Sequence, residues 1–394
     1  MRRMTMGSIK EYVKTIEQDV IALRRHFHQH PEPSLKEYET AKKIESELDK
    51  LNIPHVRVGE TGVLATIKGQ KGDGRTILLR ADIDALEIAE KTGVSYASLN
   101  EGLSHACGHD AHTAMGLGTA RILNDLRDTF AGKVYIAFQQ AEEIGAGAKQ
   151  FVASGLIDDI DESIGVHTNS ASKVGTILAR GGAVNASCDI FKIHLKGLSA
   201  HVGKPHLGID AVVAASQLVV SLQTIVAREI SPVEEAVLGV GRLQAGTRYN
   251  IVANDAEIEG TIRAYSNETR AQLKAAIERV VSGIATTYRC EYDIKWHDAA
   301  APVINDAECA KEALAVAQTI DGFDTFVDTY EKSMGADDYA DYTVKKPGVY
   351  VLLGTQSGHD TAYGHHHEKF NIDERALSLG VEFEVNYILS RLNK

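Results

Sequence analysis

Thr76-Ile-Leu-Leu-Arg80 is a short apolar run that is followed directly by two carboxylates, Asp82 and Asp84. Its length and composition predict a buried strand that leads into polar residues. A stretch rich in small residues, Thr113 to Leu126, then has the spacing of a helix. Strands that alternate with helices in this way predict an α/β domain, whose mostly parallel sheet is flanked by helices.

The same pattern of an apolar run ending in polar residues occurs twice more downstream. Lys133-Val-Tyr-Ile-Ala-Phe138 precedes Glu142 and Glu143, and Ser163-Ile-Gly-Val166 precedes His167. In open parallel sheets, ligands bind at the carboxyl ends of the strands. We therefore expect these side chains, together with the two aspartates, to converge on one site.

The ends of the chain extend this domain on both sides. A helical stretch from Ser8 to Leu51 is interrupted at Pro31 and Pro33, because proline ends a helix. Near the other end, Gly348-Val-Tyr-Val-Leu-Leu353 predicts one more strand, and Asp373 to Leu392 predicts a closing helix.

The middle of the chain follows a different order of elements, strand-helix-strand-strand-helix-strand, which is typical of a ferredoxin-like fold. The segments are Cys188–Lys196, Ile209–Arg228, Val233–Gln244, Ile251–Tyr265, a helix from Asn267 to about Tyr288, and Cys290–Trp296. Asn267 is a plausible N-cap of the second helix. We therefore predict an inserted α+β domain at residues 185–298, with residues 1–184 and 299–394 forming the larger α/β domain.

Composition limits the classes of function that fit the chain. Its 394 residues are too many for one ordinary core, and its formal net charge of −12 argues against nucleic acid or an anionic membrane as the main partner. The first residues contain no apolar run of the length that a signal peptide needs. Four cysteines do not form a disulfide framework in so long a chain, so we expect a cytoplasmic protein with reduced thiols.

His105-Ala-Cys-Gly-His-Asp110 places Cys107 and His109 two residues apart across a glycine. Thiolate and imidazole are ligands that zinc and similar metals prefer, and Asp110 could orient a liganding histidine. Gly364-His-His-His-Glu368 adds further imidazoles near the C-terminus. Each feature alone has an ordinary structural explanation, but their combination with the carboxylates after the predicted strands favours a metal site.

At these residues the sequence resembles the metal-dependent amidohydrolases and peptidases that include aminoacylases, hippurate hydrolases and auxin-conjugate hydrolases. The resemblance covers nearly the whole chain. The motifs that carry it are Leu23-Arg-Arg-His-Phe-His-Gln-His-Pro-Glu32, Arg80-Ala-Asp-Ile-Asp-Ala-Leu86, His105–Asp110, Gln140-Ala-Glu-Glu143, Gly165-Val-His167, Ala200-His201, Pro205-His206, Met334-Gly-Ala-Asp-Asp-Tyr339, and His366 four residues before Phe370.

The resemblance implies a role for each of several side chains in a site with two divalent metal ions. The residues that would hold the metals are Cys107, His109, Glu143, His167 and His366. Glu142 would be the general base. Zn²⁺ or Mn²⁺ are the expected ions, and Co²⁺ and Ni²⁺ also suit these ligands. Because His366 lies between His365 and His367, the register of this ligand is open by one residue.

The resemblance further implies that the inserted domain is a lid and a dimerisation domain, so that the protein is a homodimer or a higher homo-oligomer. His201 would help to stabilise the tetrahedral oxyanion, in the same subunit or across the dimer. Asn250 and Arg263 would bind the polar or carboxylate end of the substrate, because the arginine fork donates two hydrogen bonds to a carboxylate.

The activity implied is hydrolysis of the amide bond of N-acyl amino acids. A metallo-aminopeptidase, carboxypeptidase or dipeptidase acting on short peptides is the nearest alternative. A second alternative is a cysteine hydrolase, in which Cys107 is the nucleophile and His109 or His112 is its base. A third is a metal-dependent binding protein without catalysis, against which the presence of Glu142 argues.

Overall fold

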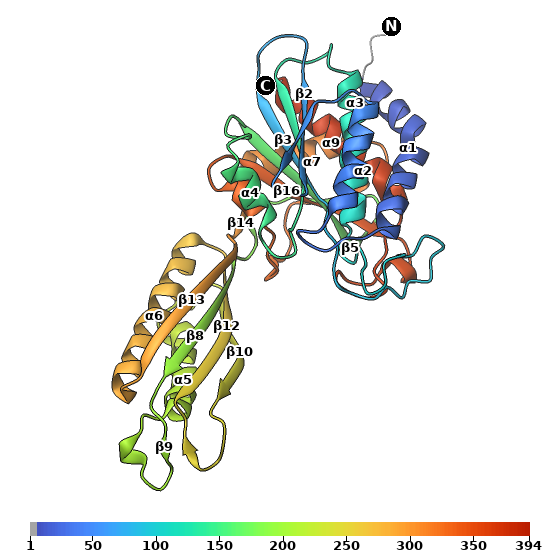
Figure 1. Ribbon diagram of the computed structural model, residues 1–394. Helices are drawn as coiled ribbons and strands as arrows, with labels where there is room; N and C mark the ends of the chain where they lie inside the picture. The colour runs from blue at the N-terminus through green and yellow to red at the C-terminus, as the bar shows by residue number, and fades with distance from the viewer. Residues whose placement is uncertain (1–5) are drawn as a thin grey trace. The chain divides into compact units, whose positions relative to one another are not determined.

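The computed structural model describes residues 6–394, and this part of the chain divides into two compact units. Unit 1 consists of the residues up to Gly182 together with Ile304–Glu331 and Asp338–Lys394. Unit 2 consists of Ala183–Val303 and Lys332–Asp337. Each unit has a hydrophobic core of its own. The chain passes between the units in β7 (Gly182–Asn185) and β14 (Val303–Asn305), and again on either side of Lys332–Asp337 (Figure 1).

Unit 1 is built on an eight-stranded sheet within the described residues, with the order β1-β2-β4-β3-β5-β16-β6-β15. The strands are β1 (His55–Val58), β2 (Gly62–Lys68), β3 (Thr76–Asp82), β4 (Lys133–Gln139), β5 (Glu162–Lys173), β6 (Thr176–Leu178), β15 (Thr325–Val327) and β16 (Gly348–Gln356). The central strands β4, β3, β5 and β16 run parallel. This sheet confirms the predicted α/β class.

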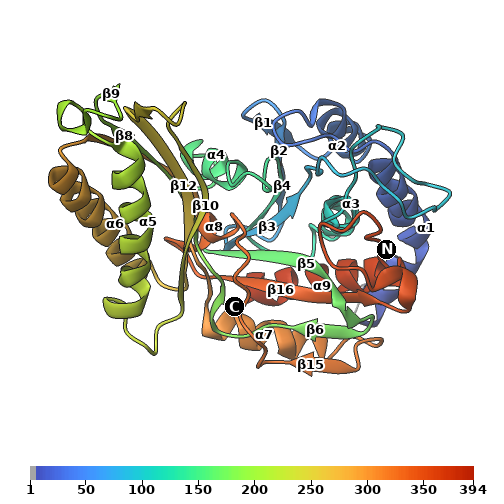
Figure 2. The same cartoon turned by 90° about the horizontal axis from the view of Figure 1, so that it is seen from below.

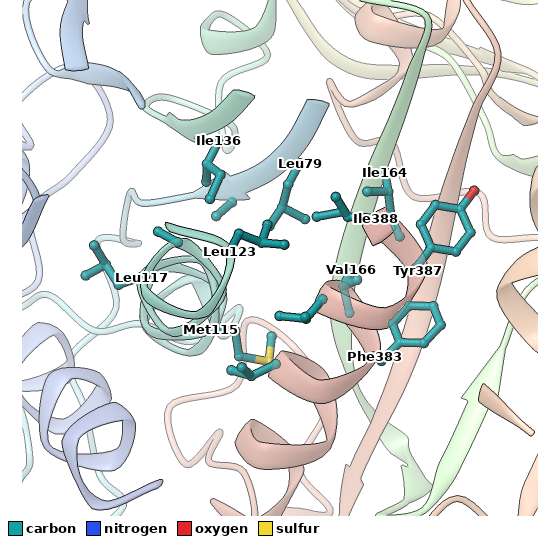
Figure 3. Close-up of a cluster of buried hydrophobic side chains, with 14 of the residues drawn as sticks. Leu79, Met115, Leu117, Leu123, Ile136, Ile164, Val166, Phe383, Tyr387 and Ile388 are labelled. Atoms are coloured by element: carbon teal, nitrogen blue, oxygen red, sulfur yellow. The ribbon is translucent and has the colours of Figure 1, made fainter. Parts of the chain in front are cut away.

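Helices cover this sheet and bury its central strands. They are α1 (Met6–Gln29), α2 (Tyr38–Lys50), α3 (His109–Asp125), α4 (Gly147–Ala153), α7 (Ala307–Ala317), α8 (Ala340–Thr343) and α9 (Arg375–Leu392). Every residue of β3 is buried, as expected for a strand with both faces covered. Leu123 of α3 and Phe383 of α9 point toward side chains of the strands, such as Val166 of β5 (Figure 3).

Two of these elements differ from the prediction in ways that affect the functional residues. β5 continues to Lys173, so His167 lies within the strand and not after its end. The apolar run of β5 stops early, but backbone pairing with β16 carries the strand on through polar residues. α3 begins at His109, four residues before the predicted start, because the polar first turn hid it from the apolar pattern.

Unit 2 contains a four-stranded antiparallel sheet with the order β10-β12-β8-β13. Its elements are β8 (Cys188–Lys196), β9 (Ala200–His201), α5 (Ala211–Arg228), β10 (Ala236–Ala245), β11 (Ile251–Val252), β12 (Asp255–Ala264), α6 (Asn267–Tyr288) and β13 (Glu291–Ala300). The two helices lie side by side along this sheet (Figure 2). Element order and strand order together match the predicted ferredoxin-like fold.

The helices of unit 2 bury one face each. On α5 the buried residues include Ala211, Leu218 and Leu222, at the spacing of one helical face. By length and composition α5 could also cross a membrane, but a core helix passes the same test. The N-cap of α6 is Ser266, which accepts a hydrogen bond from the Thr269 amide, and not Asn267 as the sequence predicted.

Candidate metal centre

The turn between Cys107 and His109 depends on a glycine. Gly108 has a φ of +91°, and a Cβ there would lie 2.3 Å from Oγ1 of Thr168. A glycine is therefore needed on both conformational and steric grounds. The backbone passes close to β5 at this point, which brings Cys107 and the first residue of α3 to within reach of His167.

Two further segments reach the site through strained backbone. Ala141 and His366 are non-glycine residues with φ values of +53° and +65°. Such conformations persist when the surrounding structure enforces them, and they cluster at functional sites. Ala141 directly precedes Glu142 and Glu143. The backbone amide of His366 donates to the Ala106 carbonyl oxygen over 2.8 Å.

Ligand atoms of Cys107, Glu143 and His366 all lie within 4.8 Å of one another. His366 Nε2 is 3.4 Å from a Glu143 carboxylate oxygen, and Cys107 Sγ is 3.7 Å from His167 Nε2. His109 Nε2 is 3.9 Å from the second oxygen of Glu143. The structure thus brings together all five side chains that the resemblance implied as ligands, from four separate segments of unit 1.

The histidines are oriented with one nitrogen toward this cluster. His109 Nδ1 donates to the Asp84 carbonyl oxygen over 2.9 Å, and His167 Nδ1 donates to the Thr168 carbonyl oxygen over 2.8 Å. In both rings the neutral form then carries its lone pair on Nε2, which is the arrangement that metal-binding histidines use. His109 Nε2 and Glu143 Oε1 are buried and have no hydrogen-bond partner among the described residues.

His112 and Asp82 also lie beside His109 and His167, but their hydrogen bonds and ion pairs indicate a structural role and not metal binding. His112 Nδ1 is 2.5 Å from Asp82, and His112 Nε2 accepts the Thr168 amide over 2.9 Å. Both nitrogens of the ring are therefore occupied. Asp82 in turn pairs with the buried Arg80, so these residues form a structural network behind the candidate ligands.

Burial and neighbouring charges shift the titration of the cluster. Burial raises the pKa of Glu143 to about 7, although His109 opposes the shift. Burial, with the adjacent Glu143 carboxylate, also raises the pKa of the Cys107 thiol. Burial alone would lower the pKa of His109, but Asp82 and Cys107 raise it. Buried groups that compete for protons in this way are stabilised when a cation replaces those protons.

Glu142 lies beside Glu143 in this cluster, and its side chain is 10 % exposed against 9 % for Glu143. One of its carboxylate oxygens is 3.9 Å from His109 Nε2. It is thus close to the candidate ligands but more accessible to a substrate or a water than the fully buried His109.

The neighbours of His366 also have identifiable places. The ring of His365 meets the ring of His167 edge to face at a centroid distance of 5.1 Å. The ring of His367 stacks on Tyr363 at 4.6 Å, and its Nδ1 accepts the Lys369 amide. Of the three consecutive histidines, His366 is the one whose nitrogen lies with Cys107 and Glu143.

The remaining predicted site residues lie in unit 2. His201 is on β9, and the next amide, of Val202, donates to the Asn250 carbonyl oxygen over 3.2 Å. Asn250 directly precedes β11, whose Ile251 pairs with His201, so His201 and Asn250 lie near each other. Arg263 lies on β12, where it donates to the Thr261 hydroxyl over 2.6 Å. Arg263 is therefore on neither of the two short strands β9 and β11 that His201 and Asn250 belong to or adjoin.

Sequence reasoning missed the buried network formed by Arg80, Gln139 and Asp338. The Arg80 guanidinium is 3.1 Å from both the Gln139 side-chain oxygen and an Asp338 carboxylate oxygen. The Ala148 amide at the start of α4 donates to the same aspartate. A charged residue at the end of an apolar strand was the available signal, since a buried arginine requires a partner.

Comparison with known proteins places this geometry in a family. The model of peptidase family M20/M25/M40 matches residues 78–390. N-acetyl-L-cysteine deacetylase of Bacillus subtilis is 39 % identical over 371 residues, which cover 93 % of this chain and 86 % of the relative. N-acyl-L-amino acid amidohydrolase of Geobacillus stearothermophilus is 40 % identical over 77 % of this chain and 82 % of the relative.

A solved structure extends the likeness to three dimensions. The crystal structure of a dinuclear metal-binding peptidase of the M20 family from Bacillus subtilis is 37 % identical, with a TM-score of 0.83. The alignment covers 96 % of this chain and 99 % of that one. The chain therefore belongs to peptidase family M20/M25/M40, and it is a metal-dependent hydrolase that cleaves carbon–nitrogen bonds.

Proposed function

We propose that this chain hydrolyses the amide bond of N-acyl amino acids at a site that holds two divalent metal ions. The observation that carries the proposal is the set of ligand atoms around Glu143 Oε1 and His109 Nε2, which are buried and have no hydrogen-bond partner among residues 6–394. The relatives that deacetylate N-acetylcysteine and hydrolyse N-acyl amino acids support the substrate class.

The ligands divide between two ions according to their positions. Cys107, Glu143 and His366 would hold one ion, because their donor atoms are mutually close. His109 and His167 would hold the other, with Cys107 near both. The thiolate favours zinc, while imidazole and carboxylate also suit manganese, cobalt and nickel. When bound, such ions lower the pKa of water and polarise the carbonyl of the scissile amide.

Glu142 is the general base in this proposal. It lies beside the ligand cluster, so it can accept a proton from the attacking water and deliver it to the leaving nitrogen. His201 would donate a hydrogen bond to the tetrahedral oxyanion. Its Nδ1 accepts the Gly203 amide over 2.9 Å, so the neutral ring carries its proton on Nε2 and can donate from there.

Substrate recognition and assembly follow from the family resemblance. Asn250 and Arg263 would bind the polar or carboxylate end of the substrate. We also propose that the inserted domain serves as a lid and joins subunits in a homodimer or a higher homo-oligomer, and that the protein is cytoplasmic. Short peptides are the second candidate substrates, because the family includes peptidases.

The test combines metal content with a substrate panel. Metal per chain is measured by elemental analysis, and hydrolysis of N-acetyl, N-benzoyl and dipeptide substrates is followed before and after chelation. We expect about two metal ions per chain and activity that is lost on chelation and regained with Zn²⁺ or Mn²⁺. A preference for dipeptides would show that short peptides, and not N-acyl amino acids, are the substrates. Activity in metal-free protein would contradict the two-metal mechanism.

The cysteine hydrolase is tested with the same preparation. The raised pKa of the buried Cys107 thiol disfavours it as a nucleophile. Cys107→Ser should lose metal together with activity if the thiolate is a ligand. Retention of both metals in an inactive Cys107→Ser protein would instead favour a nucleophilic thiol.

A further inference from the structure

Arg24, on α1, is a fully buried charged residue that lies outside the proposed catalytic machinery. Such a residue is costly to bury unless its charge is paired and its donors are satisfied. Its Nε donates to Asp110 Oδ2 over 2.8 Å, and its Nη2 donates to Asn371 Oδ1 over 2.8 Å. Glu374 lies 3.3 Å from Nη1, and the ring of Tyr96 is 5.0 Å from the guanidinium carbon.

The first of these partners is attached to two candidate ligands. Asp110 directly follows His109 in the first turn of α3, three residues after Cys107. It is fully buried and also lies 2.8 Å from His28 Nδ1. Arg24 and His28 therefore contact the same carboxylate oxygen of Asp110.

The second partner belongs to the segment that carries His366. Asn371 follows that histidine by five residues and is itself buried. At the site, the segment of His366 contacts the segment of Cys107 and His109 through the hydrogen bond from the His366 amide to the Ala106 carbonyl oxygen. Arg24 therefore joins the same two segments a second time, through side chains and from α1.

We propose that Arg24 is a positioning residue that sets the spacing between the Cys107–His109 segment and the His366 segment, so that the metal affinity of the site depends on α1. This inference rests on the proposed two-metal function. Metal–ligand distances tolerate displacements of only about 0.2 Å. One guanidinium that holds both segments at fixed separation therefore acts on the affinity directly, although it touches neither metal nor substrate.

The first test compares Arg24→Lys with Arg25→Lys. Lysine keeps the buried charge beside Asp110 but loses the fork that reaches two partners at once. Arg25 is the matched control, because it also pairs with Glu374 but has a side chain that is 46 % exposed. Metal dissociation constants are measured by chelator competition. We expect affinity to fall on the order of 10- to 100-fold in Arg24→Lys, and to stay at the wild-type value in Arg25→Lys.

A second variant covers the case in which Arg24→Lys does not fold. Asn371→Ala removes the link to the His366 segment and leaves the Arg24–Asp110 ion pair in place. It should weaken one of the two ions, the one that His366 helps to hold. Thermal midpoints with and without metal separate this effect from general destabilisation, because a positioning role lowers the stabilisation that added metal provides.

The inference is overturned if both Asn371→Ala and any folded Arg24→Lys bind both ions as tightly as the wild type, with midpoints that fall equally in the metal-free and loaded proteins. That outcome leaves the proposed function intact. Failure of the proposed function is recognised separately, in the wild-type protein, by the absence of bound metal or of amide hydrolysis.

Discussion

At the scale of single residues, the adjacent glutamates Glu142 and Glu143 both lie 3.9 Å from His109 Nε2, but Glu143 is the one that groups with Cys107 and His366. The Glu143 amide donates to Asp84 Oδ2 over 3.1 Å, and its carboxylate faces His109 and His366. The left-handed backbone at Ala141 begins the turn from which both project. Because Glu143 groups with Cys107 and His366, it is the candidate ligand, and Glu142 beside it can act as the base.

Glu142→Gln should keep both metals and the fold but lower kcat by roughly a hundred- to ten-thousand-fold, because the amide cannot accept the proton from water. Turnover and metal content are measured on the same sample. Glu143→Gln is the matched comparison, since it makes the same chemical change one residue away and should release metal. If Glu142→Gln lost metal instead, Glu142 would be a ligand and another group would be the base.

At the scale of elements, the start of α3 sets the geometry of the candidate centre. Gly108→Ala should destabilise the protein by about 1–2 kcal/mol through its left-handed φ alone, and by about 1–3 kcal/mol more through the contact with Thr168. It should also reduce metal content, because Cys107 and His109 flank this residue. Chemical denaturation and elemental analysis measure the two effects.

Gly93→Ala is the control for this variant. Gly93 has a φ of +75°, but a Cβ there would meet nothing within 4 Å. It should show the backbone strain without the steric part and without loss of metal. Equal destabilisation of the two variants would mean that the close approach of Gly108 to Thr168 has no energetic role.

A buried carboxyl group, that of Glu384, lies at the contact between α3 and α9, away from the candidate metal ligands. Glu384 is buried, the Thr119 hydroxyl donates to its carboxyl oxygen over 2.6 Å, and burial raises its pKa to about 8. Its folded pKa lies above the unfolded value, so the folded state holds a proton that the unfolded state has lost. This group therefore makes stability fall as the pH rises from about 4.5 to about 8.

Glu384→Gln should remove this dependence, because glutamine keeps the shape without a titrating proton. Relative to the wild type, the free energy of unfolding of the variant should rise by roughly 1.4 kcal/mol per pH unit across that window, and the difference should level off above pH 8. Urea unfolding at several pH values measures it. Glu11→Gln, at an exposed position on α1, should show no such gain; a constant difference between Glu384→Gln and the wild type would refute the burial argument.

At the scale of the whole molecule, the candidate ligands and His201 belong to units with separate cores. His201→Ala should therefore leave metal content and the melting behaviour of unit 1 unchanged while it lowers turnover. Steady-state kinetics and elemental analysis test this. Metal loss in His201→Ala would contradict the assignment of the ligands to unit 1 alone.

Mixing of inactive subunits tests whether His201 acts across a dimer. Glu142→Gln and His201→Ala chains, differently tagged and assembled together, should regain part of the wild-type activity if each supplies what the other lacks. Verified mixed dimers that remain inactive would place the action of His201 within its own subunit, and a purely monomeric protein would remove the proposed dimer.

The sequence was sufficient for the fold class because apolar runs and helical spacing reflect burial directly. The strand from Thr76 and the order of elements in residues 185–298 were predicted in this way, and the candidate ligands came from short polar motifs and family resemblance. The sequence did not predict the length of β5 or the start of α3. Backbone pairing with β16 sets the length of β5, and the turn at Gly108 sets the start of α3. Neither cause leaves an apolar pattern in the sequence.

By itself, the sequence determined which residue types this protein can bring to a metal, because carboxylates and one imidazole follow predicted strands, and a thiol and further imidazoles occur in the motifs His105–Asp110 and Gly364–Glu368. The tertiary structure decided which of them meet. His366 and not its neighbours lies with Cys107 and Glu143, while both nitrogens of His112 are occupied. These choices depend on distances of a few ångströms between segments far apart in the chain, and only packing and hydrogen bonding fix such distances.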